Sequence, residues 1–300
     1  MIRFENVDKF VLSDLNIYIP RGKAVGLIGA SGAGKTTFLK LICGLSAPER
    51  GLVYTMGLNP VDKRKKLAEN VRALFADIPY LADDDTILGN YKLLQKVPRI
   101  SDGDFAGEYK EISERLGFAD FQNCQVKELS LGQRRRAEIG AVLLSKPKLL
   151  LLDEPTDGLD ENGKQVFYEM LAERKKEGVT LVISSHNMAE ISKVCDRIAL
   201  LDKGTCVYYG SEEQLRKKFA PIDTMCLELD GKIPDFQDLP IIKYTLDGVK
   251  VSLSYNANYV TAAEILELIL SQMVVKEVKI HKSDLPDVMI QMSKERKKNE

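Results

Sequence analysis

The feature that most constrains this chain is the segment at residues 29–37, GASGAGKTT. It fits the pattern G-x-x-x-x-G-K-[ST], with Lys35 and Thr36 in the last two fixed places. A short apolar segment precedes it at residues 24–28, and residues 38–43 follow with apolar side chains at helical spacing. A glycine-rich loop between a strand and a helix turns its N–H groups into one concavity, where they can hold phosphate oxygens. The sequence therefore predicts a bound nucleoside triphosphate.

Each residue of this loop is a candidate nucleotide contact. We expect Lys35 to bridge the β- and γ-phosphates, and the Thr36 hydroxyl to ligate Mg²⁺. The full candidate set is Gly29, Ala30, Ser31, Gly32, Ala33, Gly34, Lys35, Thr36 and Thr37. The alternative is a glycine-rich turn with an incidental lysine, and the flanking strand and helix patterns argue against it.

Two carboxylates follow an apolar run farther along the chain. Residues 148–152 are apolar apart from the first, as expected of a strand buried on both faces, and Asp153 and Glu154 come next. We expect Asp153 to complete the Mg²⁺ shell of the triphosphate, and Glu154 to act as the general base that polarises water. Two acids after a strand could also be a simple polar loop, but the phosphate-binding loop upstream favours the catalytic interpretation.

The pattern of strands and helices predicts an α/β fold with two domains. Strands alternate with helices after residue 133, which indicates a parallel sheet with helices on both faces. A helical insertion is expected at about residues 77–135. We place the first domain at residues 1–219 and a small α/β domain at residues 220–300, with a hairpin turn at 247–248 and a last helix from Asp284.

Composition excludes several classes of function. Lys and Arg total 43 against 44 Asp and Glu, so the overall charge does not favour nucleic acid. The five cysteines form no C-x-x-C pair and are expected to be reduced thiols. No apolar run approaches the ~18 residues of a membrane span, and we expect no export signal in MIRFENVDKF. Work at a membrane would therefore need a partner that holds the protein there.

One further motif carries a family resemblance. Residues 129–136, LSLGQRRR, resemble the signature motif of ATP-binding-cassette (ABC) ATPases, LSGGQ, with its third position varied. The motif lies between the phosphate-binding loop and Asp153, in the family's order. The resemblance implies a P-loop NTPase core with an N-terminal antiparallel β part. It also implies a head-to-tail dimer with two ATP molecules, in which Ser130, Gly132 and Gln133 of one subunit close over the other subunit's nucleotide.

The same resemblance implies roles for three further residues. His186 follows a predicted strand at residues 180–184 and corresponds to the histidine that contacts the γ-phosphate. Asp160 corresponds to the residue that couples the two sites across the dimer. Phe10 lies near the place of an aromatic side chain that stacks on adenine, although it could equally be an ordinary apolar residue of a strand region.

The chain departs from the family at one position. Family members usually carry a glutamine where the chain enters the helical insertion, and alignment on TILGN at residues 86–90 puts Asp77 there. We expect Asp77 to face Mg²⁺ and the attacking water, with its charge compensated by the metal. The alternative is that Asp77 is a solvated loop residue.

The resemblance extends to one class of transporter. Residues 129–160 and 184–204 resemble ATPases of the ABC-2 export class, and SDLPDV at residues 283–288 is similar to that class's closing S-L-E-D-V-F. This implies an ATPase that energises a separate membrane-spanning permease from the cytoplasmic face of the membrane, as a homo- or heterodimer and without a nucleic-acid partner. The alternatives are a soluble cassette ATPase acting on nucleic acid or ribosomes, and a P-loop kinase or GTPase. The signature motif and His186 argue against the kinase or GTPase.

Overall fold

The chain forms two compact units. The computed structural model describes residues 1–96, 101–144, 146–230, 236 and 239–283. Contacts divide the chain into Met1–Gly210 and Ser211–Glu300, here unit 1 and unit 2. The sequence placed the division after residue 219, whereas the contacts group helix α8 (Glu212–Phe219) with unit 2. The predicted helix from Asp284 lies outside the described residues.

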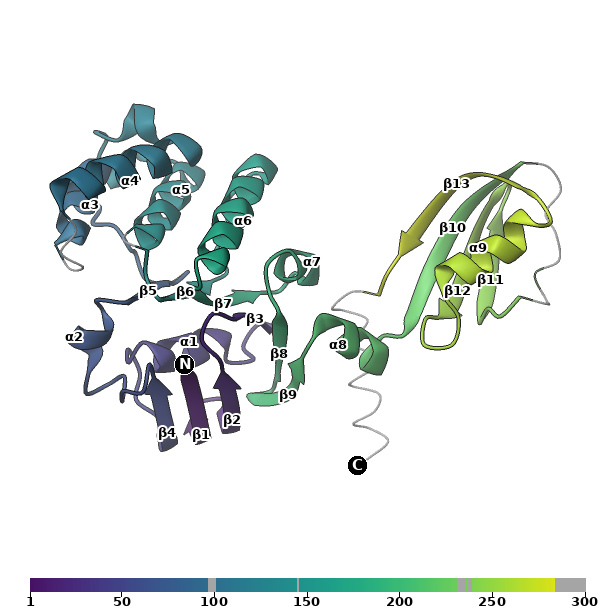
Figure 1. The fold of residues 1–300 in the computed structure, drawn as a ribbon, viewed down its shortest axis with the longest axis horizontal. Coiled ribbons are helices and arrows are strands. Elements are labelled where there is room, and N and C mark those ends of the chain that lie inside the picture. The colour runs from purple at the N-terminus through teal and green to yellow at the C-terminus, as the bar shows by residue number, and fades with distance from the viewer. Residues whose placement is uncertain (97–100, 145, 231–235, 237–238, 284–300) are drawn as a thin grey trace. The chain divides into compact units, whose positions relative to one another are not determined.

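Unit 1 begins with a small antiparallel sheet. Strands β1 (Ile2–Lys9), β2 (Leu12–Ile19) and β4 (Arg50–Thr55) pair in the order β2-β1-β4 (Figure 1). Their inward-facing side chains, such as Phe4 and Leu15, are almost fully buried. The period-two burial of β2 is what its sequence alternation predicts for a strand with one solvated face.

The second sheet of unit 1 places the functional loops together. Its strand order is β5-β6-β7-β3-β8-β9. The first five strands in this order run parallel to one another, and β9 is antiparallel to β8. The strands are β3 (Ala24–Ile28), β5 (Val71–Leu74), β6 (Leu149–Asp153), β7 (Thr180–Ser185), β8 (Arg197–Asp202) and β9 (Thr205–Gly210). Every residue of β3, β6 and β7 is buried, which explains their continuous apolar sequence. Because these three parallel strands are neighbours, the loops after them meet at one edge of the sheet.

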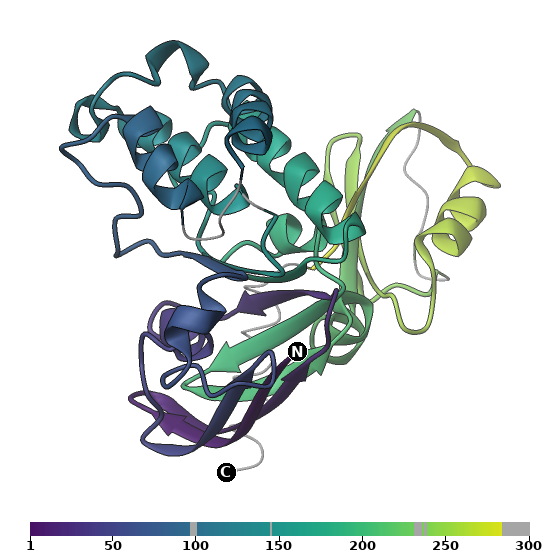
Figure 2. The ribbon, with the colours of Figure 1, turned by 60° about the vertical axis from the view of Figure 1, so that its left-hand side comes forward.

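Helices cover both faces of this sheet. Helix α1 (Lys35–Ile42) packs against β4, β6 and β7, between the two sheets, and Phe38 stacks on Phe4 with ring centroids 4.5 Å apart. Helices α6 (Glu161–Lys176) and α7 (Met188–Ser192) lie on the opposite side (Figures 1 and 2). The charged segment at residues 62–70 contains the short helix α2 (Arg64–Leu67).

The helical insertion packs around one buried tyrosine. It contains α3 (Ile87–Gln95), α4 (Asp102–Arg115) and the start of α5 (Leu131–Leu143), with 3₁₀ turns at Ala119–Phe121 and Val126–Glu128. Tyr91 is fully buried and donates a hydrogen bond of 2.7 Å to the Ala137 carbonyl of α5. Its ring contacts those of Tyr109 and Phe118, so apolar packing joins the three helices.

Unit 2 is a four-stranded antiparallel sheet with one helix against it. The order is β11-β12-β10-β13, formed by β10 (Ile222–Asp230), β11 (Lys243–Asp247), β12 (Lys250–Asn256) and β13 (Val274–His281). The predicted hairpin joins β11 to β12, with Gly248 at φ 60°. Helix α9 (Ala262–Leu270) buries Ile265 and Ile269 against Leu227 and Leu253 of the sheet.

Candidate functional site

The phosphate-binding loop has the conformation that its glycines predict. It runs from the end of β3 to α1, with Gly32 at φ 79° and Gly34 at φ 101°, where a side chain would strain the backbone. At Gly29, a Cβ atom would lie 2.4 Å from the Leu201 carbonyl oxygen. The loop borders a cavity of about 470 Å³. The cavity is lined by Phe10, Val11, Ser31, Gly32, Ala33, Gly34, Lys35, Thr36, Thr37, Ala76, Asp153 and Glu154.

The ammonium group of Lys35 lies above this loop. Its Nζ donates a hydrogen bond of 2.8 Å to the Gly29 carbonyl oxygen and is 3.4 Å from that of Ala30. The same Nζ is 3.5 Å from Oε1 of Glu154. The cation therefore lies between the loop and the carboxylate, within the cavity that the loop N–H groups border, where it can attract a phosphate.

Thr36 and Asp153 form a pair of neighbouring oxygen donors. The Thr36 hydroxyl donates to Oδ2 of Asp153 at 2.7 Å, and Asp153 is only 2% exposed. Ser184 donates to the other oxygen, Oδ1, at 2.6 Å. A hydroxyl and a buried carboxylate beside a phosphate loop are the hard ligands that Mg²⁺ prefers, so these two residues fit that ion. The structure thus brings together two of the three residues that the sequence proposed for the metal.

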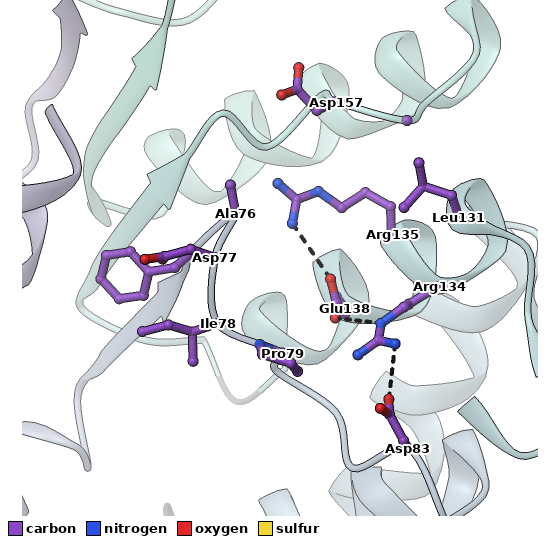
Figure 3. A pocket seen from close by; sticks show the side chains of 12 residues that line it. Ala76, Asp77, Ile78, Pro79, Asp83, Leu131, Arg134, Arg135, Glu138 and Asp157 are labelled. Carbon is purple, nitrogen blue, oxygen red and sulfur yellow. Dashed lines mark hydrogen bonds and ion pairs between the residues drawn. The ribbon is translucent and has the colours of Figure 1, made fainter. Parts of the chain in front are cut away.

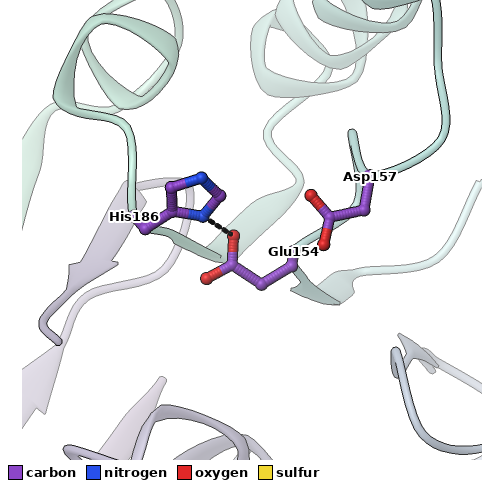
Figure 4. A group of neighbouring side chains, drawn as sticks. All are labelled: Glu154, Asp157 and His186. Carbon is purple, nitrogen blue, oxygen red and sulfur yellow. Dashed lines mark hydrogen bonds and ion pairs between the residues drawn. The ribbon is translucent and has the colours of Figure 1, made fainter. Parts of the chain in front are cut away.

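Glu154 is held in an unusual backbone conformation. Its φ is 43°, in the left-handed region that costs a non-glycine residue on the order of 1–3 kcal/mol. Its N–H donates to the Ser184 hydroxyl at 2.9 Å, and its Oε2 is 3.0 Å from Nδ1 of His186. Asp157 joins this group, with ligand-type atoms of Glu154, Asp157 and His186 all within 4.8 Å of one another (Figure 4). The two predicted catalytic residues are therefore in direct contact.

Arg135 of α5, which the sequence analysis did not single out, holds the backbone around Glu154. Its guanidinium donates to the carbonyl oxygens of Asp153 at 3.3 Å, Glu154 at 2.8 Å and Pro155 at 3.0 Å. Burial lowers the pKa of Arg135, although arginine remains protonated. In the sequence LSLGQRRR, Arg135 is one of three consecutive arginines, a pattern typical of a solvated charged surface. Its helical spacing, four residues before Ile139, indicates an inward-facing side chain but does not identify the carbonyl groups that it contacts.

Glu190 is a second site residue that the sequence analysis missed. It is 8% exposed, and its Oε2 accepts hydrogen bonds from Thr156 at 2.8 Å and Ser185 at 3.3 Å. Lys164 donates to Oε1 at 3.1 Å. Burial raises the pKa of Glu190, but the hydrogen bonds from Thr156 and Lys164 outweigh it and the pKa is lowered. The carboxylate thereby joins the loop after Glu154 to the residue before His186.

The signature residues lie at the exposed start of α5. Ser130 caps the helix by accepting from Gln133 N at 3.3 Å, and Gln133 Oε1 accepts from Ser130 N at 2.9 Å. Gly132 lies close to the next loop, since a Cβ there would be 3.0 Å from the Gly158 carbonyl oxygen. Ser130 is exposed, and Leu131 beside it is 74% exposed. In the described part of the chain, the cavity of the phosphate loop has no lining residue from α5.

Asp160 and Phe10 occupy different parts of the site. Asp160 caps α6 by accepting from Gly163 N at 3.0 Å, and a hydrogen bond from Arg136 at 2.7 Å lowers its pKa. Phe10 is in the turn between β1 and β2, 75% exposed, at the rim of the phosphate-loop cavity. Lys9 Nζ lies 4.3 Å from the centre of its ring.

Asp77 does not join the expected metal ligands. Its carboxylate forms an ion pair of 2.6 Å with Lys40 of α1 and is 57% exposed. Its neighbour Ala76, rather than Asp77, lines the cavity beside Thr36 and Asp153. Lys40 lies one helical turn after Thr36 and provides the countercharge for Asp77. The predicted contact of Asp77 with the metal is therefore not made in this conformation.

A second cavity lies between the parallel sheet and the helical insertion. Its volume is about 470 Å³, and exposed apolar side chains of Ile78 and Leu131 line it (Figure 3). Arg134 on its wall forms ion pairs with Asp83 at 2.9 Å and Glu138 at 3.2 Å. Arg135 also lines this cavity, here called the insertion groove, and so connects it to the backbone of Glu154.

Comparison with known proteins identifies the family. The family profile described as ABC transporter matches residues 12–157. The uncharacterized ABC transporter ATP-binding protein YhcH of Bacillus subtilis is 30% identical over 292 residues, which cover 96% of this chain and 92% of YhcH. This chain belongs to the ABC transporter ATP-binding family.

Two other ABC proteins are informative. The Nod factor export ATP-binding protein I of Rhizobium etli is 27% identical to this chain over 286 residues. The match covers 95% of this chain and 89% of that protein. The dimeric ATP-binding cassette MJ0796 in a post-hydrolysis state, bound to ADP and Pi, is 26% identical with a TM-score of 0.62, covering 70% of this chain and 98% of that one. This chain is therefore an ATP-binding and ATP-hydrolysing subunit of an ABC transporter. Among its described residues, every helix falls short of what a membrane span requires.

Proposed function

We propose that this chain energises an exporter of the ABC-2 class by closing as a dimer on ATP and driving a separate membrane-spanning permease. The observation that carries the proposal is the arrangement of the phosphate loop, Glu154 and His186 at one edge of the sheet, with the signature start exposed on α5. The match to a Nod factor export protein over 95% of this chain supports the export class, because it includes unit 2 as well as the cassette.

Nucleotide binding follows from the loop geometry. The N–H groups of the loop and the start of α1 hold the β- and γ-phosphates, and Lys35 neutralises their charge. Thr36 and Asp153 would hold Mg²⁺, which supplies charge neutralisation at the phosphate oxygens when bound. Phe10, exposed at the rim of the same cavity, is placed to stack on the adenine ring.

Glu154 acts as the general base for hydrolysis. Its carboxylate lies between Lys35 at 3.5 Å and His186 at 3.0 Å, on the side of the cavity that faces the loop. A water between Glu154 and the γ-phosphorus would lose its proton to Oε1 or Oε2 as its oxygen attacks the phosphorus, while the bond from that phosphorus to the β–γ bridging oxygen breaks and ADP leaves. His186, 71% exposed at its side chain, can hydrogen-bond both Glu154 and the γ-phosphate and so align them.

A second subunit completes the site. Ser130 and Gly132 form the N-terminus of a helix, with N–H groups that favour an anion, yet in one chain they do not reach the phosphate-loop cavity. In the proposed dimer, each chain provides this helix start to the other chain's ATP. Asp160, which caps α6 and pairs with Arg136 of α5, is proposed to couple the two sites.

The permease is proposed to dock at the insertion groove. Apolar Ile78 and Leu131 lie at its surface, with Arg134 and Asp83 paired at its wall, a mixture typical of transient interfaces. Docking there would hold the chain at the cytoplasmic face of the membrane. It would also place the partner against the helix that carries the signature motif.

The variant Glu154→Gln tests this function. We expect turnover to fall by about 10²–10⁴-fold, because the general base is lost, while ATP binding is kept. Light scattering after size exclusion should then show an ATP-dependent dimer. Glu169→Gln, an exposed residue of α6, is the matched control and should behave as wild type. A Glu154→Gln protein that stays monomeric with ATP, or hydrolyses it at the wild-type rate, would contradict the proposal.

A test of the export function requires the membrane-spanning permease as well as this chain. Co-expression with a candidate permease should recover the chain in the membrane fraction and raise its ATPase rate. Ile78→Glu is expected to abolish recovery with the membranes while leaving ATP binding intact, since Ile78 lines the insertion groove but not the phosphate-loop cavity and lies outside the signature motif. A chain that reaches no permease and instead sediments with ribosomes or nucleic acid would refute the export function.

A further inference from the structure

We propose that Arg135 is the positioning residue that sets the orientation of Glu154, and that it transmits movement of α5 to the catalytic carboxylate. The proposal rests on the role given above to Glu154 as general base. It concerns a residue that does not line the phosphate-loop cavity and that contacts the carbonyl groups of residues 153–155.

Three successive carbonyl groups converge on one guanidinium. Arg135 Nη2 donates to the carbonyl oxygen of Glu154 at 2.8 Å and of Asp153 at 3.3 Å, and Nε donates to that of Pro155 at 3.0 Å. The side chain is 8% exposed, so these bonds have little competition from water. A planar fork of donors suits three carbonyl oxygens, whereas the ammonium group of a lysine would reach fewer of them at once.

Arg135 contacts the backbone at Glu154, the residue whose backbone conformation is strained. Glu154 has φ 43°, a conformation that persists in a non-glycine residue only where its surroundings enforce it. The N–H side of this residue is bound by the Ser184 hydroxyl at 2.9 Å, and its carbonyl side is bound by Arg135. Together these contacts determine the direction in which the side chain leaves the backbone, and hence where the carboxylate lies.

Arg135 is also connected to the two surfaces at which partners are proposed to bind. The residue is on α5, whose first turn contains the signature residues Ser130 to Gln133, and Nη1 is 3.5 Å from Oε2 of Glu138 at the insertion groove (Figure 3). Either contact of a second subunit at Ser130 or contact of a permease at the groove would shift α5. Because Arg135 bridges α5 and the strand end, such a shift changes the backbone of Glu154 directly.

The test separates positioning from nucleotide binding and from folding. Arg135→Lys keeps the charge and most of the volume but loses the fork of donors. We expect kcat to fall by about 10–100-fold, as for a small misplacement of a catalytic group, while the Kd for ATP measured by titration with a fluorescent ATP analogue stays within about twofold. The matched control is Arg174→Lys, an arginine with an 11% exposed side chain that pairs with Glu108 and Glu177, for which both constants should stay within about twofold.

The outcomes distinguish this inference from the proposed function. If Glu154→Gln loses turnover but Arg135→Lys, folded by its thermal transition, keeps it, the positioning role is refuted and the role of Glu154 stands. If Arg135→Lys loses ATP affinity as much as turnover, the residue is only structural and the inference again fails. Should Arg135→Lys not fold, Arg135→Gln, which keeps an amide donor for the carbonyls, is measured in the same way and judged by the same two criteria.

Discussion

Replacing Ser184 by alanine should show how strongly one buried hydroxyl supports the catalytic edge of the sheet. Ser184 is fully buried at the end of β7, donates to Oδ1 of Asp153 at 2.6 Å and accepts from Glu154 N–H at 2.9 Å. A hydrogen bond to a charged group contributes about 1.5–3 kcal/mol, and a neutral one about 1 kcal/mol. Loss of both should therefore lower the free energy of unfolding by about 2.5–4 kcal/mol. Turnover should also fall, because the expected Mg²⁺ ligand and the proposed general base both lose a contact.

Urea denaturation followed by circular dichroism measures this change, with steady-state ATPase activity in parallel. Ser192→Ala is the control, since its hydroxyl only donates to the Met188 carbonyl within α7 and is partly exposed. We expect the control to change stability by less than about 0.5 kcal/mol. If Ser184→Ala is as stable as the control and as active as wild type, the argument that this hydroxyl supports Asp153 and Glu154 is wrong.

Two further predictions concern Glu190 and Asp77. The pKa of Glu190 is lowered in the fold, so its contribution to stability is complete above its ordinary pKa of 4.5 and is lost as the pH falls through the folded pKa. Glu190→Gln should therefore lose less stability on acidification than the wild-type protein does. An unchanged dependence of the free energy of unfolding on pH in the acid range would contradict this. For Asp77, substitution by glutamine and by alanine should each alter Mg²⁺-dependent turnover, with a stability cost below about 1 kcal/mol because its ion pair with Lys40 is exposed. Lys40→Met removes the same ion pair from its other end, so an equal effect of Lys40→Met, or no effect of either Asp77 variant, would exclude a direct role of Asp77 at the metal.

Much of the fold follows from local sequence. The alternation in β2 and the continuous apolar runs of β3, β6 and β7 report directly on which faces are covered, so the two sheets of unit 1 could be anticipated. Element ends were less accurate. The apolar spacing predicts helices that start at Gln133 and at Phe105. Helix α5 instead begins at Leu131, because Ser130 and Gln133 form a capping box, and α4 begins at Asp102, because Ser101 caps it.

The phosphate loop, Asp153, Glu154 and His186 were predictable for a similar reason. The loop is contiguous, and its chemistry depends on glycine φ angles and on the helix that follows. The two acids and the histidine each come directly after an apolar strand. Parallel neighbouring strands bring such positions to one edge, so sequence order and strand type nearly determine their proximity.

The side chains that hold these residues in place became visible only in the tertiary structure. Ser184 and Asp153 are 31 residues apart, Arg135 and Glu154 are 19 apart, and Glu190 and Thr156 are 34 apart. Each contact depends on the strand order and on how α5 and α7 pack, which no local pattern specifies. The same is true of Asp77, for which sequence alignment predicted a metal contact, whereas packing of α1 places Lys40 within 2.6 Å of its carboxylate. Sequence alone thus determined which groups are the candidates for the chemistry, because their spacing follows from loop and strand geometry. Only the packing of distant segments decided which buried donors and charges orient those groups.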